Sequence, residues 1–432
     1  MFSERTMISR TYSCSRVVTR SAPAPNRIDR LQPFEAGRRA EAMPSPSYPI
    51  TGIAICNSTG SNCQKVRQSL FEGRSGLGPS PIPLPFESVV GAVDFELPTL
   101  PPELEAWTTR TTQIASLLLS ELGAKLDQLR SRWRPERIAV LLGTSTGGAD
   151  TTENAYRTFL SSGSFPAEYD LFRQHTFGSI LHVVSSLSGA IGPAWMVSTA
   201  CTSSAKPLAS ARRLIAAGII DAAIVGGIDT LCSMTLHGFR SLDALSKGAC
   251  RPFSAERDGL NVGEGGAFLL IEKSGEPIAM LEGVGESSDA YHISAPHPEG
   301  LGARLAMERA LEEAGCSAES VDHVNAHGTG TRLNDLAESA AIEAILGLEV
   351  PVVSTKSYTG HLLGAAGATE AVLSVMSIME GWIPASLRAG PIDEKIAIRV
   401  NETRLDGRVD RVLSNSFAFG GNNISVVIGA PR

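Results

Sequence analysis

The sequence predicts an α/β protein whose largely parallel sheet is covered by helices on both faces. Three observations lead to this fold class. Short apolar stretches alternate with segments of helical spacing from about residue 48 to the end. Glycine is abundant, at 42 residues, while aromatic residues make up only 6% of the chain, a mix that suits tight strand-to-helix turns. A faint internal repeat indicates that the fold is duplicated.

The individual elements follow from residue type and spacing, in chain order. We expect a strand at residues 50–55, a short helix at 64–70, and an irregular loop rich in Pro and Gly at 75–102. The spacing of Ile114, Leu117, Leu118 and Leu122 predicts a helix over 109–129. Further strands are expected at 138–142, 196–199, 222–227, 267–271 and 323–326.

The repeat consists of two short matches in similar surroundings. Val197-Ser198-Thr199 ends one apolar strand, and a helix of small residues follows it as far as Gly218. Val353-Ser354-Thr355 ends another, and a helix rich in Ala and Gly follows it to about Gly381. Each half then supplies a further apolar strand with glycines. A duplicated α/β unit is therefore predicted, with the join near Gly275.

The first stretch of the chain differs from the rest. Residues 1–42 carry eight Arg, no Lys and four acidic residues, a net charge of +4 that leaves −11 for the remainder. This segment could be an organelle transit peptide, or an over-extended translation that precedes a true start at Met43. Under both interpretations we expect residues 1–46 to be a disordered extension, followed by halves at 47–275 and 276–432.

Composition excludes several classes of protein. With 43% hydrophobic residues the chain can bury a large core, so it is not wholly disordered. The net charge of −7 argues against a nucleic-acid binder. No apolar run reaches about 18 residues, so no membrane span is expected. The seven cysteines contain no Cys-x-x-Cys pair, which indicates a reducing, cytoplasmic compartment rather than disulfides or a zinc site.

Cys201 is the strongest candidate for chemistry. It lies where the strand at 196–199 is expected to turn into a helix. The positive end of a helix favours a thiolate, and free backbone N–H groups there can stabilise an oxyanion. A buried structural cysteine is the alternative.

Two histidines stand beside small residues that would let a ligand approach closely. His327 begins His-Gly-Thr-Gly-Thr after the strand at 323–326, and His361 lies in Thr-Gly-His-Leu-Leu-Gly. His323 and His327 could be a metal pair at i, i+4, but the glycine and β-branched residues around them argue against a helix, so no metal is expected. Lys356 and Glu370 flank His361, and burial of these charges would require partners.

These segments together resemble the β-ketoacyl-[acyl-carrier-protein] synthases, in particular the type II elongating condensing enzymes. The resemblance covers residues from about 47 to 432. It rests on six ordered motifs: Thr199-Ala-Cys201; Cys250-Arg-Pro-Phe with Arg257-Asp-Gly and Gly263-Glu-Gly-Gly; Ser288-Asp-Ala-Tyr-His292; Asn325–Thr331 with Asp335; Thr355-Lys-Ser with Thr359–Gly367; and Asn415–Asn423. The family has the thiolase fold, two duplicated α/β halves packed as α-β-α-β-α layers, and it is usually dimeric.

The resemblance implies a role for each candidate residue. Cys201 would carry the acyl group, and His327 and His361 would assist decarboxylation of malonyl-carrier, with Lys356 and Glu370 in support. The backbone N–H groups of Cys201 and Phe419 would form the oxyanion hole. The remaining implied positions are Thr329 and Thr331 for the pantetheine arm, Phe419 and Asp289 for gating, and Arg251, Ser294 and Arg110 for docking of the acyl carrier protein. No cofactor is implied.

The pathway and the partner stay open at this level. The reaction could extend fatty acids or specialised polyene or polyketide chains. The enzyme could be a homodimer or a heterodimer with a synthase-like subunit. Two alternatives compete with the synthase. A chain-length-factor-like partner would lack the nucleophile, which is present as Cys201. A coenzyme A-dependent thiolase would carry a second cysteine near the C-terminus, where Phe419-Gly-Gly stands instead.

Overall fold

The computed structural model describes residues 46–431. The extension expected at residues 1–46 therefore lies outside the described residues, apart from its last position. Among the helices that are described, none has the length and the apolar character needed to cross a membrane.

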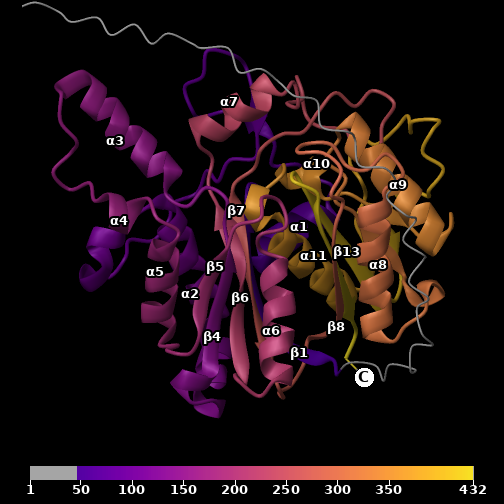
Figure 1. Ribbon diagram of the computed structural model, residues 1–432, viewed down its shortest axis with the longest axis horizontal. Coiled ribbons are helices and arrows are strands. Elements are labelled where there is room, and N and C mark those ends of the chain that lie inside the picture. Colours follow the sequence, from indigo (N-terminus) through magenta and orange to yellow (C-terminus); the bar gives the residue numbers. More distant parts are fainter. Residues whose placement is uncertain (1–45, 432) are drawn as a thin grey trace, which may run out of the picture. The chain divides into compact units, whose positions relative to one another are not determined.

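One ten-stranded sheet organises the described chain (Figure 1), in the order β10-β9-β13-β14-β8-β1-β7-β6-β4-β5. Its first block is β1 (Tyr48–Asn57), β4 (Ile138–Gly143), β5 (Ala194–Val197), β6 (Ala222–Asp229) and β7 (Gly265–Glu272). Its second block is β8 (Ala279–Ser288), β9 (His323–Asn325), β10 (Val352–Val353), β13 (Arg411–Ala418) and β14 (Asn422–Gly429). Two small sheets pair β2 (Gly78–Pro79) with β3 (Val89–Val90), and β11 (Trp382–Ile383) with β12 (Leu405–Asp406).

The two blocks repeat one pattern of pairing. In the first, β1 and β7 pair antiparallel, β7 and β6 pair antiparallel, and β6, β4 and β5 run parallel. In the second, β8, β14, β13, β9 and β10 follow in the same sequence of directions. Strands β5 and β10, which end at the two matched Val-Ser-Thr segments, take equivalent outer positions. The repeat in the sequence is therefore a structural duplication.

The expectation of a largely parallel sheet is wrong. Only the outer strands of each block run parallel, whereas the inner strands pair antiparallel, including β1 with β8 across the junction of the blocks. The inner strands β1, β7 and β14 are buried along almost their whole length. Strands buried on both faces read as continuous apolar runs, so their composition carries no signal of direction.

Helices cover and separate the two blocks. They are α1 (Cys63–Phe71), α2 (Arg110–Arg132), α3 (Ala149–Ser162), α4 (Leu171–Gln174), α5 (Gly178–Ser188), α6 (Lys206–Ala216), α7 (Ser233–Ser241), α8 (Leu301–Ala314), α9 (Arg332–Leu346), α10 (Lys356–Thr359) and α11 (Ala366–Glu380). Short 3₁₀ turns are η1 (Pro102–Trp107), η2 (Pro135–Arg137), η3 (Ala318–Ser320) and η4 (Leu363–Ala365).

The hydrophobic core forms layers that confirm the α-β-α-β-α packing. Side chains of α2 and α5 pack on one face of the first block. Helices α6 and α11 lie on its other face, and α11 also contacts β13 and β14 of the second block (Figure 1). Helices α8 and α9 cover the outer face of the second block. The central position of α11 explains why twelve of its residues are buried, among them Glu370.

Candidate active site

Cys201 lies in a tight turn between β5 and α6, at the inner end of a cavity. Ala200 holds a positive φ of 52°, and the N–H of Ser203 donates to the carbonyl of Ala200 at 3.1 Å. The expectation that the helix begins at Cys201 is wrong by several residues, because α6 begins at Lys206 after a series of turns. A turn this tight leaves the backbone N–H of Cys201 without a helical acceptor.

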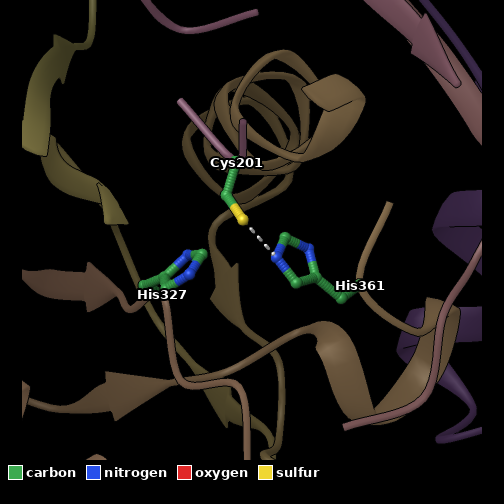
Figure 2. A group of neighbouring side chains, drawn as sticks. All are labelled: Cys201, His327 and His361. Atoms are coloured by element: carbon green, nitrogen blue, oxygen red, sulfur yellow. Dashed lines mark hydrogen bonds between the residues drawn. The ribbon is translucent and has the colours of Figure 1, made fainter. Parts of the chain in front are cut away.

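His361 and His327 converge on the sulfur of Cys201 (Figure 2). The His361 Nε2 atom lies 2.9 Å from Cys201 Sγ, and the centroids of the two imidazole rings are 5.2 Å apart. The His361 backbone is anchored by its N–H, which donates to the Asn261 carbonyl at 2.7 Å. The structure thus brings together three residues that are up to 160 positions apart in the sequence.

Burial makes Cys201 a neutral thiol. Desolvation raises the pKa of the Cys201 thiol to about 12. This effect is larger than the opposite effects of the Lys356 charge and of the backbone N–H groups of Phe419 and Cys201, which lower the pKa. This result corrects the expectation of a thiolate favoured by a helix terminus, because desolvation outweighs a partial backbone charge. A neutral thiol beside an imidazole must give up its proton to become a nucleophile, and His361 is within reach to accept it.

Both histidines are neutral imidazoles at neutral pH. Burial and the positive charge of Lys356 hold the pKa of His327 and that of His361 well below 6.5. A neutral imidazole has one N–H donor and one acceptor, so each ring can donate one hydrogen bond into the cavity.

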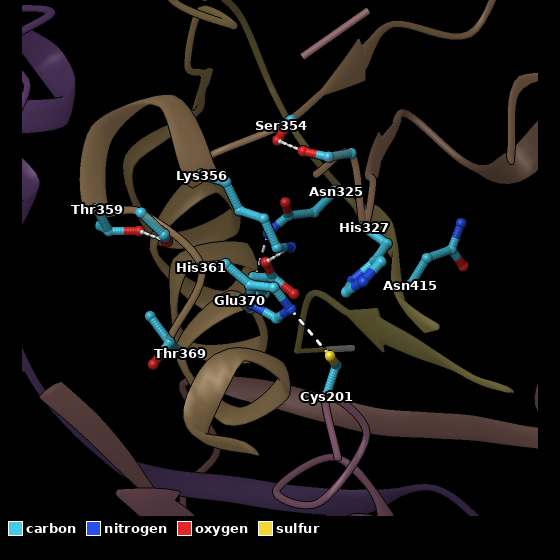
Figure 3. A network of polar contacts seen from close by, with 12 residues as sticks. Cys201, Asn325, His327, Ser354, Lys356, Thr359, His361, Thr369, Glu370 and Asn415 are labelled. Atoms are coloured by element: carbon cyan, nitrogen blue, oxygen red, sulfur yellow. Dashed lines mark hydrogen bonds and ion pairs between the residues drawn. The ribbon is translucent and has the colours of Figure 1, made fainter. Parts of the chain in front are cut away.

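Lys356 and Glu370 form a buried ion pair behind the histidines (Figure 3). Lys356 is 2% exposed and Glu370 is 3% exposed. Burial raises the pKa of Glu370 to about 7, against the lowering effect of Lys356. The second carboxyl oxygen of Glu370 has no hydrogen-bond partner among residues 46–431. The pair therefore keeps a positive charge close to the site at a considerable cost in desolvation.

A cavity of about 710 Å³ leads from the surface to Cys201, His327 and His361. Thr329, Thr331, Asp289, Ser294 and Phe419 all line it, so five more of the predicted positions share one cavity with the candidate catalytic residues. The hydroxyls of Thr329 and Thr331 lie 2.8 Å apart. The volume of this cavity and its lining, which extends to the buried Cys201, suit an extended arm that reaches in from outside.

Phe419 and Asp289 stand on two segments that are hydrogen-bonded to each other. The Asp289 carboxylate accepts from Asn423 Nδ2 at 2.8 Å, and the Asp289 N–H donates to the Gly421 carbonyl at 2.9 Å. The Phe419 side chain is 40% exposed and lies 6.0 Å from the ring of Phe239.

Two of the expected docking residues do not line the cavity. The Arg110 guanidinium donates twice to the buried Glu264 carboxylate, at 2.6 and 2.9 Å, and once to the Val93 carbonyl, so its bonds are structural. Arg251 is half-exposed and pairs with Glu256. The cations that do line the cavity are Arg240, Lys247 and Arg332, which sequence reasoning missed because no local pattern marks them.

Glu338 is a further residue that the sequence did not reveal. Its carboxylate accepts from the N–H groups of His327 and Gly328, at 2.8 and 2.7 Å, and from the amide of Asn415 at 3.3 Å. Glu338 therefore anchors the backbone that carries His327. The donor atoms of Cys201, His327 and His361 lie within 4.8 Å of one another, a set that could also hold a thiophilic metal ion.

Comparison with known proteins identifies the family. The model of the β-ketoacyl synthase N-terminal domain matches residues 111–276, and that of the C-terminal domain matches residues 278–389. Nodulation protein E of Rhizobium meliloti is 33% identical over 392 residues, which are 87% of this chain and 96% of the relative. The 3-oxoacyl-[acyl-carrier-protein] synthase 2 of Coxiella burnetii is 32% identical over 414 residues, 88% and 97% of the two chains.

A solved structure agrees with this assignment. The ketosynthase ApeO from Xenorhabdus doucetiae, in complex with its chain length factor ApeC, superposes with a TM-score of 0.85 at 38% identity. The similarity covers 89% of this chain and 98% of the matched one. The chain therefore belongs to the β-ketoacyl synthases, acyltransferases of the thiolase fold that form carbon–carbon bonds.

Proposed function

We propose that Cys201 accepts an acyl group from an acyl carrier protein and that the enzyme condenses it with malonyl-carrier. The products are 3-oxoacyl-carrier, carbon dioxide and free carrier. The observation that carries this proposal is the contact of 2.9 Å between His361 Nε2 and Cys201 Sγ at the end of a deep cavity.

Acyl transfer begins with the neutral thiol. As Sγ attacks the thioester carbonyl, the thiol proton moves to His361 Nε2, and the carbonyl oxygen becomes an oxyanion. The backbone N–H groups of Cys201 and Phe419, which lie close enough to the sulfur to lower its pKa, would stabilise that oxyanion. Collapse of the tetrahedral adduct expels the carrier thiolate, which takes the proton from His361.

Condensation uses both histidines as donors. The malonyl thioester oxygen accepts from the two neutral imidazoles, with His361 now in the tautomer that carries its proton on Nε2. The carboxylate leaves as carbon dioxide, and its electron pair forms the enolate. The enolate carbon attacks the acyl thioester on Cys201, and the sulfur leaves as a thiolate, which takes up a proton from solvent. The role of Lys356, with Glu370, is to add to the effect of burial, because burial first and its charge second lower the pKa of both imidazoles and keep them neutral.

Carrier docking belongs to the same proposal. The arm of the carrier would pass Thr329 and Thr331, with Phe419 and Asp289 as the gate. The carrier, which the resemblance implies to be acidic, would be attracted by Arg240, Lys247 and Arg332 at the cavity and by Arg251 nearby. Ser294, in the cavity lining, would offer a hydrogen bond.

A partner subunit is also part of the proposal. The outer edge of β5 is partly exposed, and Ile191, close to its start, is 67% exposed. An open strand edge with apolar neighbours favours pairing with another chain. A second copy would give a homodimer, and the complex of ApeO with its chain length factor supports the alternative of a synthase-like subunit.

The division into halves at 47–275 and 276–432 and a cytoplasmic location complete the proposal. The chain passes from β7 to β8 through residues 273–278, which supports the division. Among the described residues, Cys56, Cys63, Cys201, Cys232 and Cys250 are free thiols, which supports a reducing compartment.

Intact-mass spectrometry tests the function directly. The purified protein is incubated with acyl carriers of different chain length, and then with malonyl-carrier. We expect one acyl adduct that maps to Cys201, followed by 3-oxoacyl-carrier and release of carbon dioxide. An acyl adduct on the Cys201→Ala variant, or an unmodified wild-type protein with every carrier, would contradict the proposal and favour a non-catalytic partner subunit.

A further inference from the structure

Asp229, the last residue of β6, is a buried carboxylate that no cation neutralises within the described part of the chain. It is 0% exposed and accepts hydrogen bonds from neutral donors alone. These are Thr144 Oγ1 at 2.6 Å, Ser145 N at 2.9 Å, Ser145 Oγ at 2.7 Å, Thr146 N at 2.8 Å, Thr146 Oγ1 at 2.7 Å and Gly364 N at 2.5 Å. Burying a carboxylate is costly, so such a complete set of donors marks a position where the fold needs the acceptor.

Most of these donors lie in the turn that follows β4, whereas Gly364 comes from the second half of the chain. It belongs to the segment that carries His361 and lies 135 positions from Asp229 in the sequence. Its backbone is in close contact with the acceptor, because a Cβ added at Gly364 would lie 2.7 Å from Asp229 Oδ2. The hydrogen bond to Asp229 thus fixes the His361 segment against the ends of β4 and β6.

The carbonyl group of Gly364 contacts the turn that follows Cys201. The Gly364 carbonyl accepts from the N–H of Ser204 at 2.9 Å. Ser204 Oγ in turn accepts from the N–H of Ala368 at 2.9 Å. Gly364 and Ser204 each stand three residues after a proposed catalytic side chain, His361 and Cys201. One glycine therefore links the two segments whose side chains meet at 2.9 Å.

We infer that Asp229 is a positioning residue, which holds Gly364 and thereby sets the contact between His361 Nε2 and Cys201 Sγ. The inference rests on the proposed roles of these two side chains. Since the buried thiol must transfer its proton to His361, a small displacement of that segment separates donor from acceptor. A misplacement of 1 Å far from the reacting atoms can reduce a rate by about 100-fold.

The test compares Asp229→Asn with a matched control, Glu272→Gln. Glu272 lies on the neighbouring strand β7, at the opposite end of the β6–β7 pair, and is 1% exposed. Its carboxylate accepts from Thr51 Oγ1 at 2.5 Å and Trp133 Nε1 at 2.6 Å and pairs with Arg132. The rate of acyl loading of Cys201 is measured by intact mass beside the melting temperature. We expect both variants to lose stability, but loading to fall at least tenfold only in Asp229→Asn.

The pH dependence of loading is a readout that a purely structural role would not move. In the wild type His361 is neutral across pH 6 to 9, so the rate stays flat. With the contact broken, the thiol must ionise by itself, and the rate rises about tenfold per pH unit. Loading of Asp229→Asn within twofold of wild type, or an equal loss in Glu272→Gln, would overturn the inference. A wild-type protein that is not loaded would instead contradict the proposed function.

Two milder substitutions test the inference if Asp229→Asn does not fold. Ser145 Oγ contacts both Asp229 Oδ2 and, at 3.0 Å, the N–H of Gly364, whereas Thr144 Oγ1 contacts Asp229 only on the side away from Gly364. Ser145→Ala should therefore slow loading severalfold and make it rise with pH, while Thr144→Val should leave the profile flat. Identical profiles in these two variants would overturn the inference.

Discussion

Removing either charge of the buried pair between Lys356 and Glu370 should have unequal effects. Glu370→Gln leaves an ammonium group that is 2% exposed without a counter-charge, which costs about 3–5 kcal/mol of unfolding free energy. Lys356→Met leaves a carboxyl group whose pKa burial already raises to about 7. That group becomes neutral by binding a proton, so Lys356→Met should cost less at pH 7 than Glu370→Gln.

The double variant separates stability from catalysis. Replacement of a buried ion pair by apolar residues of similar size is often neutral or stabilising, so Lys356→Met with Glu370→Leu should lie within about 1 kcal/mol of wild type. Its condensation rate should nevertheless fall at least tenfold, because the positive charge that Lys356 places close to the developing enolate is gone and burial alone then lowers the pKa of both histidines.

Urea unfolding at pH 7 of Lys356→Met, Glu370→Leu and their double variant gives the coupling energy. The exposed pair of Arg67 and Glu380, 2.7 Å apart, is the control, and its removal should change stability by about 0–1 kcal/mol. A double variant that loses as much unfolding free energy as the two single variants together would show that the two charges do not compensate each other, which contradicts the prediction. Wild-type condensation by the double variant would refute the electrostatic role.

Three further predictions concern single residues. His327→Ala should still load Cys201 but lose about 2–4 kcal/mol of transition-state stabilisation in decarboxylation, seen as loss of carbon dioxide release from malonyl-carrier; normal release would contradict its role. Arg332→Glu should raise KM for carrier substrates and weaken the salt dependence of that KM. Arg251→Glu should have a smaller effect, because Arg332 lines the cavity and Arg251 does not. Equal KM values for wild type and Arg332→Glu would exclude this docking surface. His323→Leu should stabilise the fold by about 1–2 kcal/mol in urea unfolding, because neither ring nitrogen of this buried side chain has a well-formed hydrogen bond within the described residues. Destabilisation would show that the ring makes a favourable interaction, such as one with the Val324 backbone.

Periodicity predicted the local elements of this fold well. The strands around residues 138–142, 222–227 and 267–271 and the helix over 109–129 agree with β4, β6, β7 and α2 within a few residues. Such elements follow from side chains that repeat at short intervals, which a linear sequence shows directly. Strand direction in the sheet depends instead on partners far apart in the chain, and the inner strands gave no signal of it.

The candidate site likewise contains residues that the sequence predicted and residues that only the folded structure reveals. The resemblance to a known family supplied Cys201, His327 and His361, and the structure places their side chains together. Carboxylates that hold backbone, such as Glu338 and Asp229, could not be found, because their donors come from other segments and no spacing marks them. The predicted docking role of Arg110 took no account of its ion pair for a related reason. Its partner Glu264 lies 154 residues away, so the sequence could not show that the guanidinium already binds a carboxylate.

The depth of the site has a chemical consequence. Burial keeps Cys201 as a neutral thiol and keeps both histidines uncharged, so the resting site holds no exposed nucleophile for water-borne electrophiles to attack. In the proposed mechanism the nucleophile forms only when a thioester carbonyl reaches Sγ and the proton passes to His361 over the existing contact of 2.9 Å. The same low-dielectric surroundings strengthen the hydrogen bonds that the imidazoles donate to the enolate oxygen. Desolvation, which appears as a cost in the free enzyme, therefore contributes both selectivity and transition-state stabilisation once the substrate is bound.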